Sequence, residues 1–126
     1  MKPLFADASF YIALLNQGDE LFPLAKPYAA DVTTEFVIIE VANFFARFQY
    51  RQKSVELYSR LIQSASTRIF PASSDLFSKG FELYKARSDK DWSLTDCCSF
   101  VVMEELKLEE ALPAISTLSR QASSVS

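Results

Sequence analysis

The sequence predicts an α/β fold in which a short parallel sheet carries helices on both faces. Short apolar stretches alternate with longer, helix-like apolar stretches along the chain, a pattern typical of parallel strands joined by helical crossovers. Of the 126 residues, 49% are hydrophobic, which suits one packed domain and argues against a disordered chain. We therefore predict a single domain over residues 1–126, with a polar tail from about residue 119.

Four short apolar segments are predicted strands, at residues 4–6, 32–33, 67–70 and 108–114. The predicted helices lie between them, at about residues 10–15, 34–50, 54–64, 74–84 and 94–105. Two prolines, Pro23 and Pro27, interrupt any helix over residues 20–30. The segment at 34–50 is apolar nearly all round, so we expect this helix to be buried on most sides.

The composition excludes several kinds of chemistry. The chain has no histidine, which removes Ser-His-Asp and Cys-His catalysis and histidine-ligated zinc. Its two cysteines, Cys97 and Cys98, are adjacent, so they are too close for an ordinary disulfide and lack the spacing of a metal-binding pair. We interpret them as small apolar helix residues. Any catalysis must therefore use carboxylates, hydroxyls, lysine or arginine.

Charge and hydropathy bear on partners and location. The net charge is −3, whereas a general nucleic-acid binder is usually basic; RNA binding would need a local basic stripe or metal ions. No apolar run is long enough to span a membrane. Asp7 interrupts the apolar N-terminus, so it does not resemble a signal peptide. We expect a cytoplasmic protein.

A polar loop becomes an apolar helix at residues 91–98. Ser93-Leu94-Thr95-Asp96 has the spacing of a capping box, in which Ser93 caps the helix and Asp96 reaches back to the amide of Ser93. A carboxylate in the first turn also suits the helix dipole. This structural interpretation explains Asp96 without any catalytic role.

Two further acids lie at unusual positions. Asp7 falls between the first predicted strand and a helix, where it either caps that helix or joins a site at the carboxyl edge of the sheet. Glu40 lies inside the apolar helix and needs a cationic partner, either Arg, Lys or a metal ion. If the three acids converge, they repel one another, and Mg²⁺, which prefers oxygen ligands, would relieve this. We predict that their carboxylates lie within reach of one cation.

Three motifs, in this order, resemble those of a PIN domain: Phe5-Ala6-Asp7-Ala8-Ser9, residues 33–41 around Glu40, and residues 91–97 around Asp96. They are most similar to the VapC-type toxin ribonucleases of bacterial toxin–antitoxin pairs, over residues 1 to about 112. The resemblance implies a three-layer α/β/α sandwich and Mg²⁺- or Mn²⁺-dependent RNA cleavage by a metal-activated water. It also implies a homodimer and inhibition by a cognate antitoxin. Asp7, Glu40 and Asp96 would be the metal-site acids, with Asp91 as a supporting acid.

One departure from the family pattern keeps alternatives open. The family has a fourth acid after the last strand, but residues 112–118 contain none, and Glu109 and Glu110 come too early. This favours a second interpretation, a catalytically impaired PIN-like module that acts through protein or RNA binding. A phosphoacceptor receiver domain is a third. It would have paired N-terminal acids and a lysine after a late strand, which this sequence lacks.

Arg47 and Arg51 are candidate substrate-binding cations. With Glu40 they share one helical stripe, at spacings of seven and four residues. On this interpretation they contact RNA phosphates beside the metal. The alternative is that both are solvated arginines near a helix end.

Overall fold

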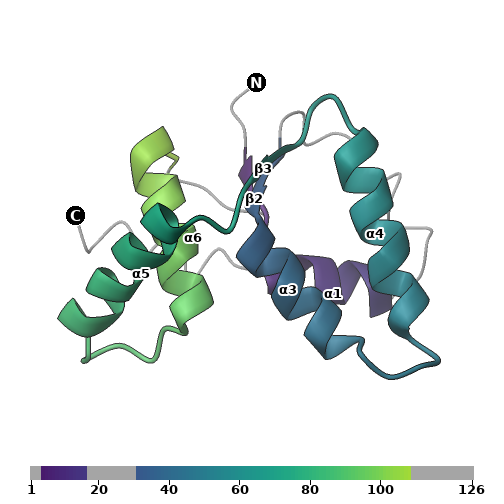
Figure 1. The fold of residues 1–126 in the computed structure, drawn as a ribbon, viewed down its shortest axis with the longest axis horizontal. Helices are drawn as coiled ribbons and strands as arrows, with labels where there is room; N and C mark the ends of the chain where they lie inside the picture. The colour runs from purple at the N-terminus through teal and green to yellow at the C-terminus, as the bar shows by residue number, and fades with distance from the viewer. Residues whose placement is uncertain (1–3, 17–30, 109–126) are drawn as a thin grey trace.

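The computed structural model describes residues 4–16 and 31–108 of the chain. Three parallel strands form one sheet in the order β1-β2-β3, namely β1 (Leu4–Phe5), β2 (Asp31–Thr34) and β3 (Arg68–Phe70). The helices in the described residues are α1 (Ala8–Asn16), α3 (Glu35–Phe44), α4 (Arg51–Gln63), α5 (Ser74–Ala86) and α6 (Leu94–Leu106). Figure 1 shows their arrangement.

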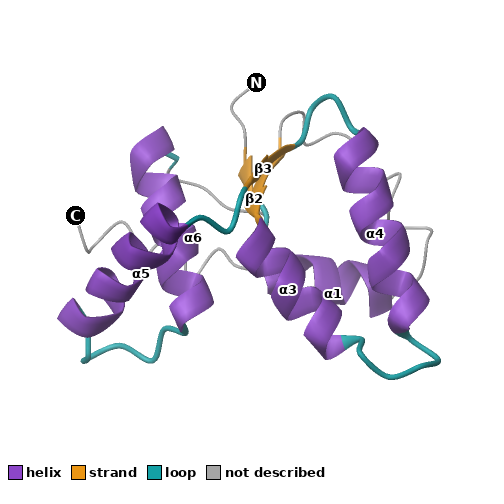
Figure 2. Ribbon diagram, viewed as in Figure 1, coloured by secondary structure: helices purple, strands orange, loops and turns teal. Residues whose placement is uncertain are grey.

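The sheet lies between two groups of helices (Figures 1 and 2). Helices α5 and α6 lie on one side of the strands, and α1, α3 and α4 lie on the other. The predicted α/β architecture with helices on both faces is therefore confirmed. Because all three strands are parallel, their carboxyl ends share one edge of the sheet, where α1 follows β1 and α3 follows β2.

One hydrophobic cluster joins the strands to the helices. Phe5 from β1 and Val37 and Val41 from α3 are fully buried in it. Trp92, just before α6, packs edge-on against Phe100 with the ring centroids 4.7 Å apart. Each buried side chain of this size contributes roughly 1.5–3 kcal/mol by leaving water. This core fixes the sheet edge from which the site residues project.

Helix starts follow the local signals in the sequence. Thr34, Ser73 and Ser93 are the N-caps of α3, α5 and α6, and each side chain accepts a hydrogen bond from an amide in the first turn. Such caps satisfy amides that have no partner inside the helix. All three helices begin where the sequence predicted.

The predicted helix over residues 34–50 is wrong at its end, because α3 stops at Phe44. Phe45 turns into the core, with only 3% of its surface exposed, and its amide donates to Val41 and Asn43 carbonyls. Arg51 then donates two hydrogen bonds to the Ala46 carbonyl, at 3.2 and 2.8 Å. Apolar residues continue in the sequence through this turn, so the pattern does not indicate that the helix ends at Phe44.

The expected burial of α3 on most sides is also wrong. Only Val37 and Val41 are buried in this helix, while Ile39 and Phe44 are 51% and 59% exposed. The prediction failed because apolar composition alone does not tell which helix faces receive a neighbour. The consequence is an exposed apolar surface beside Glu40.

Three predictions concern residues outside the described ranges. They are the interruption of any helix over residues 20–30, the final strand predicted at residues 108–114, of which only Leu108 is described, and the polar tail from about residue 119. Across residues 4–16 and 31–108, no helix combines the length and apolar character that crossing a bilayer requires.

Candidate active site

Asp7 is a buried carboxylate at the carboxyl end of β1. Only 5% of its surface is exposed, and Oδ1 has no hydrogen-bond partner among the described residues. The pKa of Asp7 is raised to about 7, mainly by burial and to a lesser extent by the charges of Asp96 and Glu40, while a hydrogen bond from the backbone of Ala8 lowers it. A buried carboxylate oxygen without a donor is costly, so this position calls for a proton or a cation.

Backbone contacts between β1 and β2 hold Asp7 in place. The Ala6 amide donates to the Val32 carbonyl at 2.8 Å, which continues the strand pairing up to the residue before Asp7. The Asp7 carbonyl then accepts from the amides of Phe10 and Tyr11, at 3.1 and 3.3 Å, and so begins α1. Asp7 therefore caps α1 through its backbone while its side chain enters the site.

Glu40 reaches the same region from α3. The expected burial of this helix on most sides does not hold at Glu40, whose side chain is exposed to solvent. Its pKa is nevertheless raised, first by desolvation and then by the charge of Asp96, while a hydrogen bond from Thr95 acts in the other direction. None of the ion pairs among the described residues joins Glu40 to a lysine or arginine. Of the partners that the sequence analysis allowed for Glu40, a lysine or arginine is therefore not found among the described residues.

Asp96 closes a capping box at the start of α6, as its spacing predicted. Its Oδ2 accepts from the Ser93 amide at 3.0 Å, and Ser93 Oγ accepts from the Asp96 amide at 3.0 Å. The charge of Asp96 also raises the pKa values of Asp7 and Glu40. The capping and site interpretations are compatible, because a carboxylate has a second oxygen that the cap does not use.

The three acids influence one another without forming a finished ligand set. In the part of the chain that the structure describes, no three acidic or cysteine side chains are placed to hold a metal ion together. Mutual repulsion between carboxylates opposes close convergence without a cation, and the cap holds one oxygen of Asp96. The carboxylate oxygens of these acids are the ligands that a hard cation such as Mg²⁺ prefers. That a single cation can contact all three carboxylates remains a prediction.

The remaining candidate residues lie away from these contacts. Asp91 is exposed in the loop before α6, and it does not contribute to the raised pKa of Asp7 or Glu40. The predicted stripe joining Arg47 and Arg51 to Glu40 is wrong, because Arg47 lies in the turn after α3 and Arg51 begins α4. Arg51 instead uses its guanidinium to cap the Ala46 carbonyl.

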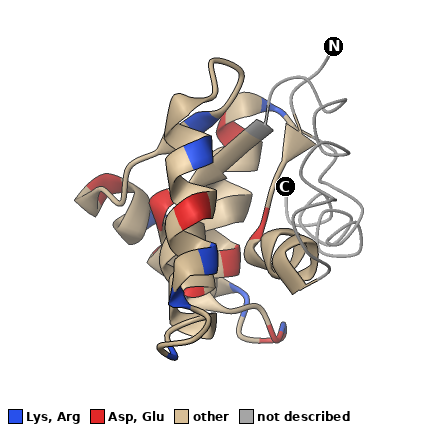
Figure 3. Ribbon diagram, turned by 90° about the vertical axis from the view of Figure 1, so that its right-hand side faces the viewer, with Lys and Arg blue, Asp and Glu red and all other residues tan. Residues whose placement is uncertain are grey.

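Charge is mixed on the face that Figure 3 shows. Lysine and arginine alternate with aspartate and glutamate along its helices (Figure 3). This face therefore carries no long basic stripe of the kind that tracks a nucleic-acid backbone.

Two threonines that the sequence did not single out support the acids. Thr33 donates to the Ala6 carbonyl at 2.8 Å, and Thr95 hydrogen-bonds to Glu40. Thr95 directly precedes Asp96, and this position beside a candidate site acid is the sequence feature that could have identified it. Thr33 has no such feature, because its partner lies 27 residues away in the sequence.

Comparison with known proteins identifies the fold. No protein-family model matches the chain, and no curated protein sequence matches it significantly. Among solved structures, it is similar to Mycobacterium tuberculosis VapC20, described as a toxin that cleaves the sarcin–ricin loop. The sequences are 24% identical, the TM-score is 0.70, and the match covers 86% of each chain. The chain therefore has the α/β fold of the VapC-type PIN domains that its three sequence motifs resemble.

Proposed function

We propose that this protein is a metal-dependent endoribonuclease that acts as the toxin of a toxin–antitoxin pair. The observation that carries the proposal is the environment of Asp7, a buried acid with an unsatisfied oxygen, whose pKa is raised by burial and then by the charges of Asp96 and Glu40. The three acids come from β1–α1, α3 and α6, the elements that carry the three PIN-like motifs. The likeness in fold to VapC20 supports RNA as the substrate class.

Asp7, Glu40 and Asp96 would hold the cation, Mg²⁺ or Mn²⁺. A bound divalent cation supplies a Lewis acid for a phosphodiester and lowers the pKa of a water molecule. The chain itself contributes three oxygen donors and a buried position at Asp7 that limits competing water. Without histidine, a carboxylate oxygen that does not contact the cation would be available to accept a proton. The raised pKa of Asp7 belongs to the metal-free chain, and a bound cation would lower it by favouring the charged form.

The proposal extends to partners and location. A toxin of this kind would form a homodimer, be inhibited by a cognate antitoxin protein, and act on RNA in the cytoplasm. These statements rest on the similarity in motifs and fold.

A direct experiment tests the proposal. The purified protein should cleave RNA with added Mg²⁺ or Mn²⁺ and lose this activity in chelator. The variants Asp7→Asn, Glu40→Gln and Asp96→Asn should each lose cleavage, whereas Asp89→Asn, at an exposed residue paired with Arg87, should retain it. Cleavage that survives chelator, or survives in all three variants, would contradict the proposal.

The second candidate function is a catalytically impaired PIN-like module that binds protein or RNA. The absence of an acid over residues 112–118 favours it. Under this alternative, no concentration of either metal supports cleavage, and adding an acid by Ile115→Asp or Ser116→Asp does not restore it. If either substitution lowers the metal concentration that cleavage needs, the enzyme interpretation gains support.

A further inference from the structure

A hollow of about 450 Å³ opens on the surface where α3 meets the start of α5. Its size falls within the range of small-ligand sites, about 300–1,000 Å³. The lining combines aromatic rings with small hydroxyl side chains: Phe36, Ala72, Ser73, Ser74, Phe77 and Ser78. We refer to it as the Phe36–Phe77 hollow.

The two rings offer an apolar surface that is only partly covered. The centroids of Phe36 and Phe77 are 6.4 Å apart, with the ring planes tilted by 43°, and Phe77 is 44% exposed. The row of rings continues along α5 through Phe81 and Tyr84, with centroids 5.8 and 5.7 Å apart. A flat ligand can therefore stack on exposed ring surface in the hollow.

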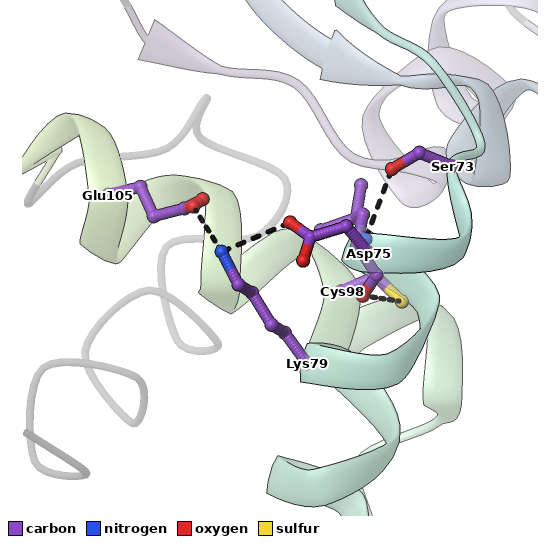
Figure 4. Close-up of polar contacts among 6 residues, drawn as sticks. Ser73, Asp75, Lys79, Cys98 and Glu105 are labelled. Carbon is purple, nitrogen blue, oxygen red and sulfur yellow. Dashed lines mark hydrogen bonds and ion pairs between the residues drawn. The ribbon is translucent and has the colours of Figure 1, made fainter.

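The polar side of the hollow favours a neutral ligand. Ser73 Oγ accepts from the Leu76 amide at 3.1 Å (Figure 4), which leaves its hydroxyl hydrogen to donate. Ser74 and Ser78 are exposed, and each hydroxyl can both donate and accept. The groups that could bind an anion here already have partners, because Glu35 accepts from the Ala72 amide and Lys79 pairs with Asp75 at 3.1 Å.

The hollow adjoins the acid cluster through α3. Phe36 and Glu40 are four residues apart on this helix, which is slightly more than one turn, or about 6 Å along the axis. Phe36 contacts α5 through Phe77, and Glu40 contacts α6 through Thr95. Both side chains therefore lie on the side of α3 that faces the α5–α6 pair.

We propose that the Phe36–Phe77 hollow binds one unpaired base of the RNA beside the cleaved linkage. The inference rests on the proposed ribonuclease function. Splayed-out RNA bases are held by stacking on aromatic side chains and by hydrogen bonds to their edges, and the hollow offers both kinds of group. Because the base is neutral, this contact needs no basic stripe, which agrees with the net charge of −3.

Amide chemical shifts of the full chain in chelator test the proposal without any cleavage. The ligands are AMP, GMP, CMP and UMP, with ribose 5-phosphate as the control that lacks a base. At least one nucleotide should shift the amides of residues 72–78, and ribose 5-phosphate should not. Phe77→Leu should weaken nucleotide binding by roughly 5- to 150-fold, which corresponds to the ~1–3 kcal/mol of one stacked base.

Two more variants sharpen the test. Ser78→Tyr should fill the hollow and abolish the shifts, while Tyr84→Leu, in the same row of rings but outside the lining, should leave them unchanged. The amide spectrum of each variant reports whether it has folded. On RNA, an abasic site beside the cleaved linkage should slow cleavage by wild type but not by Ser78→Tyr.

Three results would overturn the inference. They are no shift with any nucleotide, equal shifts with ribose 5-phosphate, and concentration-dependent shifts in residues 72–84 without ligand. The last would assign this face to contacts between copies of the chain. If nucleotides bind as expected but no RNA is cleaved with any metal, the proposed enzymatic function fails while the base-binding hollow stands.

Discussion

Thr33 donates its hydroxyl hydrogen to the carbonyl of Ala6 at 2.8 Å, from the middle strand to the residue directly before Asp7. Both residues are fully buried. The bond fixes the end of β1 at the point where the chain turns Asp7 into the site. A residue with no catalytic group thus helps to hold the buried Asp7 in its place.

Replacing Thr33 with valine should destabilise the fold. Valine has nearly the same shape but leaves the buried Ala6 carbonyl without this donor, a loss of about 1–3 kcal/mol. Urea unfolding monitored by circular dichroism measures the change. Thr33→Ser is the matched control, because it keeps the hydroxyl and removes only a methyl group. If valine is tolerated better than serine, the hydrogen bond does not hold the strand end.

Asparagine and alanine at position 96 should separate the two roles of Asp96. Asp96→Asn keeps an oxygen for the Ser93 amide but removes the charge that raises the pKa of Asp7. We expect it to lose nuclease activity, lower the pKa of Asp7, and leave the apo-protein at least as stable. Asp96→Ala also loses the cap and should cost about 1 kcal/mol.

Thermal melts in chelator and a carboxyl NMR titration of Asp7 provide these measurements. Ser93→Ala is the control, because it removes the serine side of the cap and leaves the charge of Asp96 in place. If Asp96→Asn is as destabilised as Asp96→Ala, capping by a charged group outweighs the repulsion among the acids.

The buried Asp7 should make the metal-free fold less stable as the pH rises. Its pKa is about 7 in the folded chain, against an ordinary value of 3.8, so the folded state holds this proton more tightly than the unfolded state. The resulting stability is fully present below about pH 4 and is lost as the pH rises through about 7. The difference corresponds to at most about 4 kcal/mol. Glu40 acts in the same direction, but its exposure weakens the effect.

Urea unfolding in chelator at pH 4.5 and pH 8 checks this prediction. The stability of wild type relative to Asp7→Asn should fall between the two pH values, because the asparagine cannot ionise. Asp91→Asn, at an exposed acid, should follow wild type. A constant difference between wild type and Asp7→Asn would show that Asp7 is not protonated in the folded chain.

The comparison of sequence with structure separates local from distant information. Helix starts at Thr34, Ser73 and Ser93 could be predicted, because each cap is a contact within three residues. The end of α3 and the exposure of Glu40 could not, since they depend on which elements pack against that helix. The three acids could be chosen from their positions at element boundaries and inside an apolar helix. The supporting bond from Thr33 could not, because it spans 27 residues.

Helices α5 and α6 are in close contact where Gly80 faces Cys98. A Cβ built on Gly80 would lie against the sulfur of Cys98 and 3.2 Å from both its Cα and its nitrogen. Cys98 is itself fully buried, and its sulfur lies 3.9 Å from the Leu76 carbonyl (Figure 4). The predicted role of this cysteine as a small apolar helix residue agrees with that packing.

Gly80→Ala should therefore destabilise the protein by about 1–3 kcal/mol, the usual cost of overpacking a close contact. The direction of the change is informative, because replacing glycine with alanine in an exposed helix would instead raise the free energy of unfolding by about 1 kcal/mol. Cys98→Ala should rescue part of the loss by removing the sulfur, while the backbone contact remains. Lys79→Ala is the neighbouring control. It breaks exposed ion pairs to Asp75 and Glu105 (Figure 4) and should leave the urea midpoint nearly unchanged. If Gly80→Ala raises the urea midpoint, the two helices are not held at this distance.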